Sequence, residues 1–417
     1  TQKRKKEFID VSTQMASQAL RVLGMAYQTI KTDEIEKTKL DLKEKQGKLV
    51  FAGFAGMIDP PRSEAKSAVE LCKRAGIRVV MATGDHKLTA AAIANELGIS
   101  ESSEALTGLE LDAMNDDQLD AVIGKTSVFA RVSPTHKFRI VESLRRQGQV
   151  VAMTGDGVND VPALKKANIG IAMGSGTDLA KETAEIIITD DNFKSIEEGI
   201  EGGRHAYDNI RKVTYLLIST GAAEILLFLL SLFTNQPIPL TAVQLLWLNL
   251  VTNGIQDVAL AFEGPEKDLM KRKPRDPRTG IFTRPVVALM TLGGIWSALV
   301  NLALFNWALG SGRSLEQAMT MTFVSLVLIQ FFKAYNFRSD RHSVMRHPFA
   351  NRWLNVAVLW ELMLLLLVVY LPFLQRAFGS FSLTLTDWAI VVGLAFTVSP
   401  VLELAKWFGR RQLSRDF

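Results

Sequence analysis

The sequence predicts an α/β domain built on a parallel sheet, followed by an all-α domain of six transmembrane helices. Up to about residue 200, short apolar runs alternate with amphipathic stretches, and charged residues punctuate every segment. Alternating strands and helices favour a parallel sheet with helices on both faces. After Val213, apolar blocks of about 20 residues alternate with short charged loops, as expected for helices that cross a bilayer.

The composition limits the class of protein. The chain has 417 residues, is 48% hydrophobic and carries a net charge of +5. Its basic residues gather in loops between apolar blocks, which indicates membrane topology and no nucleic-acid partner. The single cysteine, Cys72, excludes an internal disulfide framework and reads as a buried thiol. The chain begins with Thr1 inside an expected helix, so we expect a missing amino-terminal part.

The first segments contain one predicted helix and two predicted strands. Phe8–Gly24 has helical spacing, and Val22–Tyr27 and Leu49–Met57 read as strands. The sequence Asp59-Pro60-Pro61-Arg62 then forms a joint that two prolines make stiff. Such a joint suits a hinge between domains, although a plain strand-to-helix turn is equally allowed.

From Ser63 onward, strands and helices alternate. The predicted helices are Ser63–Ala75, Leu88–Leu97 and His136–Gln147, and the predicted strands are Arg78–Ala82, Val128–Ala130, Val150–Met153, Ile169–Met173 and Glu185–Thr189. Polar groups follow three of these strands directly. They are Thr83, Gly84 and Asp85, then Arg131 and Lys137, then Asp156, Asn159 and Asp160. We expect them to share the carboxyl edge of the sheet, where ligands bind in open α/β folds.

The stretch Val150–Gly174 carries the strongest candidate site. Its glycine-containing turn presents Asp156 and Asp160, and we expect Asp160 to cap the helix that Pro162 opens. Two carboxylates suit Mg²⁺, whereas a hydroxyl and an ammonium group, such as those of Thr83 and Lys137, suit phosphate oxygens. This set could therefore perform phosphoryl transfer. From turn chemistry alone, two solvated aspartates in a surface turn remain an alternative.

Six apolar blocks are long enough to cross a membrane. They are Val213–Phe233, Leu240–Phe262, Pro285–Leu309, Ala318–Asn336, Trp353–Leu374 and Leu385–Phe408. Basic residues are concentrated after the second, fourth and sixth blocks, and the opposite loops carry only Arg313 and Arg376. By the positive-inside rule, the soluble half and both chain ends are cytoplasmic. We expect a multi-pass protein of the cell membrane.

Polar groups inside these blocks are candidate cation ligands. They are Glu224 in the first block, Gln244, Asn249, Thr252, Asn253, Gln256 and Asp257 in the second, and Gln330 in the fourth. A charged side chain at the centre of a membrane helix costs about 2.5–3.5 kcal/mol, so such residues usually have a function. Hydrogen bonding between helices is the alternative, but it accounts less well for carboxylates.

Three further residues are interpreted differently. Gly254 would permit local unwinding that frees carbonyl oxygens for an ion. Glu361 and Lys333 are placed closer to the ends of their blocks, where we expect structural roles. The Lys333 side chain could then extend to the membrane interface.

Several motifs resemble those of the P-type cation-transporting ATPases, in particular the branch of the sarcoplasmic-reticulum-like calcium pumps and the sodium/potassium pumps. Thr154-Gly155-Asp156-Gly157-Val158-Asn159-Asp160 resembles the family's magnesium-binding signature, and Thr83-Gly84-Asp85 its second phosphate motif. Asp59-Pro60-Pro61-Arg62 resembles its hinge, and Phe129–Pro134 with Lys137 the segment of its phosphate-binding lysine. Leu246–Gly254 resembles the ion-binding helix of the calcium pumps.

The resemblance implies a role for each matched residue. Asp156 would bind Mg²⁺ with support from Asn159 and Asp160, and Thr83 and Lys137 would hold the phosphoryl group. The nucleotide-binding residues would be Arg21, Arg131, Thr83 and Asp85. The matched membrane residues Glu224, Asn249, Thr252, Asn253 and Gln330 would be ion ligands. Residues 50–198 would form a haloacid dehalogenase-like (Rossmann-like) phosphorylation domain, residues 1–49 the end of the nucleotide-binding domain, and residues 199–417 the transmembrane domain.

Departures from the family pattern limit the expected activity. The chain has no Asp-Lys-Thr-Gly motif, which carries the phosphorylated aspartate, and no Thr-Gly-Glu motif. It corresponds to the back half of a pump, so the chain alone should not hydrolyse ATP and needs the missing half as partner. Asn253 and Gln330 stand where calcium pumps carry acids, and Asp257 is an additional carboxylate. Calcium is the first choice of cation, with sodium or another cation as alternatives.

Two other functions remain open. A degenerate pump half could act as a binding or regulatory membrane protein without catalysis. A membrane-anchored phosphatase would need a nucleophilic aspartate, but Asp59 precedes two prolines and Asp85 already fits another motif.

Overall fold

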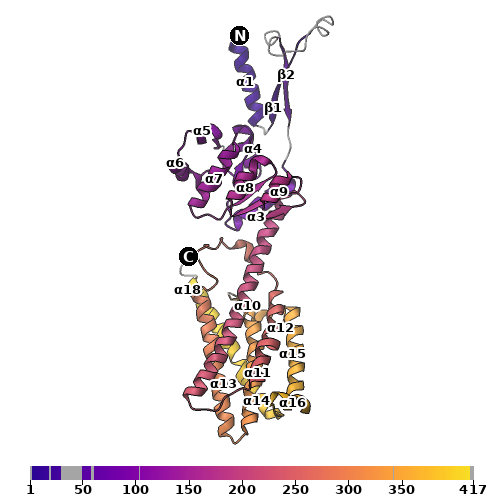
Figure 1. Ribbon diagram of the computed structural model, residues 1–417. Helices are drawn as coiled ribbons and strands as arrows, with labels where there is room; N and C mark the ends of the chain where they lie inside the picture. Colours follow the sequence, from indigo (N-terminus) through magenta and orange to yellow (C-terminus); the bar gives the residue numbers. More distant parts are fainter. Residues whose placement is uncertain are drawn as a thin grey trace. The chain divides into compact units, whose positions relative to one another are not determined.

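The computed structural model describes residues 2–17, 20–29, 49–57, 61–102, 104–340 and 342–413. The chain divides into two compact units (Figure 1). The first comprises residues 1–201 and 268–274, and the second comprises residues 202–267 and 275–417. The predicted hinge lies partly outside the described residues, because Asp59 and Pro60 are not among them.

The first unit begins with a helix packed on a strand pair. Helix α1 (Gln2–Ser17) precedes the antiparallel strands β1 (Arg21–Tyr27) and β2 (Val50–Met57). The prediction of helix up to Gly24 was wrong, since pairing with β2 satisfies the backbone of residues 21–27 and overrides their local helical pattern. Phe8 of α1 stacks on Phe51 with ring centroids 4.5 Å apart.

The rest of this unit contains two three-stranded parallel sheets. One has the order β3 (Met81–Ala82), β5 (Val128–Ala130), β4 (Leu106–Thr107), and the other β6 (Ala152–Gly155), β7 (Ile169–Met173), β8 (Ile186–Ile188). All pairings within them are parallel, as the alternating pattern predicted. Strand β3 is shorter than expected, and β4 was not predicted.

Helices connect these strands and cover their apolar side chains. They are α3 (Ser63–Arg74), α4 (Lys87–Glu96), α5 (Gly108–Asp112), α6 (Asp116–Ile123), α7 (Pro134–Arg146), α8 (Val161–Lys166) and α9 (Asp178–Thr183), with a 3₁₀ turn, η2, at Val158–Asp160. Helix α7 begins where Ser133 accepts a hydrogen bond from the His136 N–H and Pro134 fixes the first turn. Strand β5 is fully buried, so α7 starts from a rigid support.

The second unit is helical. Its elements are α10 (Phe193–Phe233), which begins in the first unit, α11 (Ala242–Trp247), η3 (Leu248–Thr252), α12 (Asn253–Ala261), α13 (Arg284–Gly310), α14 (Leu315–Asn336), α15 (Arg352–Tyr370), α16 (Pro372–Phe378), α17 (Leu385–Phe396) and α18 (Val398–Leu413). A short 3₁₀ turn, η4 (Leu269–Lys271), belongs to the first unit, and another, η5 (Val344–Arg346), follows α14. Among the described residues, five helical segments are long and apolar enough to cross a membrane: α10, α13, α14, α15 and Leu385–Phe408.

The second predicted span, Leu240–Phe262, is helical but not one regular helix. Residues 242–261 form α11, the π-helical segment η3 and α12 in succession, and each piece alone is too short to count as a span. Gly254 lies within α12, so the expectation of unwinding at this glycine was wrong. The helix is instead widened at residues 248–252, just before Gly254.

Candidate functional site

The turn after β6 is built around a buried carboxylate. Asp160, only 4% exposed, accepts hydrogen bonds from the N–H groups of Asp156 (3.3 Å) and Gly157 (3.4 Å). A side chain at Gly155 would place its Cβ 2.4 Å from the Asp160 Cβ, so the close approach requires glycine. The expected cap of α8 was wrong, because the Asp160 side chain makes no capping bond and folds back over its own turn.

Asp160 also binds the lysine predicted to hold phosphate. The Lys137 ammonium group on α7 donates to the other carboxylate oxygen at 2.5 Å, and both side chains are largely enclosed. This ion pair joins the end of β6 to the helix that follows β5. A low-dielectric surrounding strengthens such a pair and fixes the direction of the lysine.

Asp156 and Asn159 have a different environment, because both are exposed. The Asp156 backbone carbonyl accepts a hydrogen bond from the Thr177 N–H at 2.8 Å, which fixes the turn without using the carboxylate. Among the described residues, no hydrogen bond or ion pair engages the Asp156 side chain. The turn therefore presents one carboxylate to solvent and uses the other internally.

Asp191, which the sequence did not single out, supports the neighbouring loop. Its carboxylate accepts a hydrogen bond from the Ser175 N–H at 3.1 Å. Hydrogen bonds from the Ser175 side chain and N–H lower the pKa of Asp191. Asp191 also adopts a positive φ of 52°, which is unusual outside glycine. The contact depends on the pairing of β7 with β8, which brings the residues after each strand together, so the local sequence gives no sign of it.

The Thr83-Gly84-Asp85 turn follows β3 and contacts the segment after β5. The Thr83 hydroxyl donates to the Asp85 carboxylate at 2.8 Å, and the Asp85 N–H donates to the Thr83 hydroxyl oxygen at 3.1 Å. The Arg131 N–H donates to the Asp85 carbonyl at 3.0 Å. The predicted residues of these two segments therefore lie together.

Arg131 itself is held in an uncommon backbone conformation, with φ of 52°. Its carbonyl oxygen lies 2.4 Å from where a Cβ at Gly108 would be placed, so glycine is needed there. Strained backbone of this kind persists only where the surroundings enforce it, and it is concentrated at functional sites.

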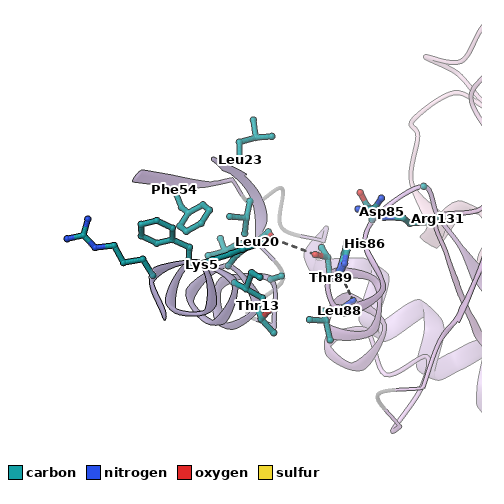
Figure 2. Close-up of a pocket in the computed structure, with 17 residues that line it drawn as sticks. Lys5, Thr13, Leu20, Leu23, Phe54, Asp85, His86, Leu88, Thr89 and Arg131 are labelled. Atoms are coloured by element: carbon teal, nitrogen blue, oxygen red, sulfur yellow. Dashed lines mark hydrogen bonds between the residues drawn. The ribbon is translucent and has the colours of Figure 1, made fainter. Parts of the chain in front are cut away.

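A cavity of about 1110 Å³ adjoins this second turn (Figure 2). Asp85, His86 and Arg131 contribute polar groups to its wall, while Leu20 and Phe54 contribute apolar surface from the strand-pair region. A hydrogen bond of 3.5 Å from the Thr89 hydroxyl to the Leu20 carbonyl joins two of the residues that line the cavity. Arg21 is the first residue of β1, but its side chain lies outside the described part of the structure.

In the membrane unit, three predicted ion ligands converge. Glu224 on α10 is 5% exposed and accepts hydrogen bonds from the Asn249 amide at 3.1 Å and the Gln330 amide at 3.3 Å. Three separate helical segments thus meet at one carboxylate, which we call the Glu224 cluster. Asn249 is itself exposed, so this cluster opens to one side.

Lys333 belongs to the same neighbourhood. It is fully buried, its ammonium group donates to the Ser219 carbonyl at 3.1 Å, and its charge attracts Glu224. The expectation that this side chain extends to the membrane interface was therefore wrong. The positive charge instead lies beside the carboxylate of the cluster.

The other predicted ligands lie on the next stretch of the same segment. Thr252 and Asn253 are buried and Asp257 is partly buried. Near them, the Gln256 amide donates to the Glu361 carboxylate at 2.7 Å. Glu361 lies at the middle of α15, so its assignment to the end of a span was wrong. Its position near the middle of the apolar block was the sequence signal that could have identified it as a candidate ligand.

Comparisons with known proteins agree with this division of the chain. Residues 237–408 match the family "Cation transporting ATPase, C-terminus", and residues 7–168 and 138–200 match haloacid dehalogenase-like hydrolase families. A calcium-transporting ATPase of Bacillus subtilis is 41% identical over 398 residues, which cover 94% of this chain and 44% of that protein.

Proteins of other organisms are similar too. The human calcium-transporting ATPase type 2C member 1 is 37% identical across 97% of this chain and 41% of its own length. The probable cation-transporting ATPase F of Mycobacterium bovis is 38% identical across 93% of this chain and 43% of its own length. The chain thus spans less than half the length of these relatives. A haloacid dehalogenase-like unit and a cation-ATPase carboxy-terminal unit thus occur in one sequence, which along nearly all of its length is similar to part of the calcium-transporting ATPases.

Proposed function

We propose that this chain is the carboxy-terminal part of an ATP-driven pump whose transported cation is Ca²⁺. The Glu224 cluster carries this proposal, because a buried membrane carboxylate accepts hydrogen bonds from side-chain amides of two other helical segments. The same chain also contains the turn with Asp156, Asp160 and Lys137, which suits a phosphoryl group and Mg²⁺. The names of the relatives and their greater length support it. The aspartate that accepts phosphate would lie in the part that only the longer protein carries.

In the soluble unit, the exposed oxygens of Asp156 and Asn159 fit Mg²⁺, which prefers hard oxygen ligands and retains water. The ion would neutralise charge on the transferring phosphoryl group. Lys137 would hold a phosphoryl oxygen, and Asp160 would fix the direction of Lys137. Thr83 would donate its hydroxyl to the same group.

ATP fits the cavity beside the second turn. Its polar wall contains Asp85 and Arg131, which suit the ribose and phosphates, and its apolar wall suits a base. Arg21 would add a further positive charge. The turns after β3 and β6 would then bring ATP and Mg²⁺ to one edge of the fold, where the missing aspartate would be phosphorylated.

In the membrane unit, Glu224, Asn249, Thr252, Asn253, Asp257 and Gln330 would supply the ion ligands. The amide groups of Asn249 and Gln330 now donate to Glu224, so both must turn to offer their oxygens when a cation binds. Neutral residues at positions 253 and 330 reduce the charge of the site, which keeps sodium as the alternative cation.

Charge distribution supports the topology. The basic loops after the second, fourth and sixth apolar blocks would face the cytoplasm, together with the soluble unit and both ends of the chain. The lipid bilayer, most simply the plasma membrane, and the amino-terminal half would be the partners of this chain.

Phosphoenzyme formation from labelled ATP tests the proposal. We expect none from this chain alone, and Ca²⁺-dependent labelling when the chain is joined to the amino-terminal part that its relatives carry. Na⁺, K⁺ and Mn²⁺ would be compared in parallel, and Glu224→Gln should weaken the dependence on the transported cation. Labelling that responds to none of these cations, or that Glu224→Gln leaves unchanged, would contradict the proposal.

A further inference from the structure

A second group of buried polar atoms lies outside the Glu224 cluster. Gln256 and Glu361 are each 1% exposed and share a hydrogen bond of 2.7 Å between α12 and α15. The remaining oxygen of each group, Gln256 Oε1 and Glu361 Oε1, is buried and has no hydrogen-bond partner. Gln256 Oε1 belongs to the same amide as the donor nitrogen, and Glu361 Oε1 to the same carboxylate as the acceptor oxygen. The two unpaired oxygens therefore lie beside the Gln256–Glu361 hydrogen bond.

Two neighbouring residues add further unpaired oxygens. Thr252 precedes Gln256 by four residues, and its buried hydroxyl has no partner. Asp257 Oδ1 is also buried and unpaired, and the Asp257 carboxylate repels that of Glu361. We call Thr252, Gln256, Asp257 and Glu361 the Glu361 cluster.

The two clusters differ in charge. Glu224 has Lys333 beside it, so the first cluster combines one carboxylate with one ammonium group. The Glu361 cluster combines two carboxylates, and within the described residues no lysine or arginine forms an ion pair with either. Two buried carboxylates without a cation are costly, and hydrogen bonding within the protein leaves four oxygens unused.

We propose that the Glu361 cluster is a second intramembrane binding site for a hard divalent cation of the Ca²⁺ class. Carboxylate, amide and hydroxyl oxygens are the ligands such ions prefer. The Gln256 amide would turn to present Oε1 in place of its NH₂ group, and Glu361 would then coordinate the ion instead of accepting that hydrogen bond. The inference builds on the proposed transport function. It adds Gln256 and Glu361 to the proposed ligands, and it assigns Thr252 and Asp257 to a second ion, apart from the one at the Glu224 cluster.

Equilibrium binding of ⁴⁵Ca²⁺ to the full-length protein in lipid nanodiscs tests the proposal. We expect about two ions per wild-type molecule. Glu361→Gln should remove one of them and leave the other, which Glu224→Gln should remove instead. Glu361→Asp, which keeps the charge, should retain two ions at lower affinity. Gln256→Met should weaken the same ion by about tenfold, the scale seen when a supporting group of a metal site is lost.

Glu403→Gln is the matched control, since Glu403 lies in the same unit and pairs with Lys406 at 2.8 Å. It should bind as the wild type does. Size-exclusion profiles and melting temperatures would show whether each variant folds. If folded Glu361→Gln and Gln256→Met both bind as many ions as Glu403→Gln, with unchanged affinity, the Glu361 cluster holds protons only and the proposal is overturned.

The same assay separates this inference from the proposed function. If Glu224→Gln changes neither binding nor phosphoenzyme formation, the assignment of the first site fails. Loss of an ion in Glu361→Gln would still establish the second site. If Glu361→Gln has no effect while Glu224→Gln abolishes Ca²⁺ dependence, the function stands and only the second site is wrong.

Discussion

At the scale of single residues, Asp160 joins the turn after β6 to helix α7. Its carboxylate binds two backbone N–H groups of its own turn and the Lys137 ammonium group of α7. Because its carboxylate is fully used in these three hydrogen bonds, Asp160 positions Lys137 and the turn. Asp156, the residue directly after β6, keeps its carboxylate in solvent and is the one available to a metal ion.

Replacement of Asp160 should separate these roles. Asp160→Asn keeps the shape but removes the charge that holds Lys137, so we expect phosphoenzyme formation in the full-length protein to fall by about 10–100-fold. Nucleotide binding should change little, because Asp160 is not part of the cavity wall. Glu142→Gln is the control, as it removes an ion pair of similar length, 2.6 Å to Lys166, away from the turn. Equal losses in both variants would contradict a positioning role.

Asp120 on α6 gives a prediction for acid pH. Hydrogen bonds from Arg146 and then Ser143 on α7 lower the pKa of Asp120. A lowered pKa in the folded state means that Asp120 stabilises the fold above the ordinary pKa of an aspartate. This contribution is lost as the pH falls through the lowered folded-state pKa.

Hydrogen–deuterium exchange of α6 and α7 tests whether the stability contributed by Asp120 is lost as the pH falls. In the wild type, protection of these helices should decline as the pH is lowered below about 4, after correction for intrinsic exchange rates. Asp120→Asn should show weaker protection at neutral pH and less further decline. A pH dependence identical to that of the wild type would exclude Asp120 as its source.

At the scale of elements, the π-helical segment η3 sets which face of its helix carries each ligand. A π-helical turn contains one residue more than an α-helical turn, so residues on its two sides face different directions from those that their spacing in a regular α-helix would give. Asn249 lies within η3 and contacts Glu224, whereas Gln256 lies after it and contacts Glu361. The widened turn thus allows one membrane segment to serve two clusters on two neighbouring helices.

Deleting Leu250 should test this arrangement. Loss of one residue would restore α-helical geometry, which keeps the segments on either side of η3 in register and displaces the residues inside it, Asn249 among them. We expect loss of the Asn249–Glu224 contact and strongly weakened Ca²⁺ dependence of phosphoenzyme formation, while the Gln256–Glu361 pair remains. Leu250→Ala is the control, because this side chain is 65% exposed and its truncation leaves the backbone intact. Unchanged Ca²⁺ dependence in the deletion variant would show that η3 has no such role.

The elements also show where sequence reasoning succeeds. Strands β5 and β7 have the bounds that the apolar runs Val128–Ala130 and Ile169–Met173 predicted, since buried strands leave a local pattern. The helix predicted to Gly24 failed because pairing with β2 is a long-range effect. The Gln256–Glu361 bond could not be foreseen either, because it depends on which helix packs against α12.

At the scale of the whole molecule, α10 is the element that both units share. It is a single helix of 41 residues, and the boundary between the units falls between Glu201 and Gly202. The same helix carries Glu224 in its membrane half. A continuous helix transmits displacement along its axis better than a flexible linker does, so under the proposed function α10 would couple phosphorylation to cation binding.

Gly203→Pro should interrupt this coupling. Proline removes one hydrogen bond of the helix and kinks it, at a cost of about 3 kcal/mol. We expect phosphoenzyme formation in the full-length protein to lose its Ca²⁺ dependence, while nucleotide binding and ⁴⁵Ca²⁺ binding each persist, because neither site includes Gly203. Gly203→Ala is the control, since a Cβ there would meet no atom within 4 Å and alanine favours a straight helix. Normal Ca²⁺ dependence in a folded Gly203→Pro protein would mean that coupling runs through other contacts.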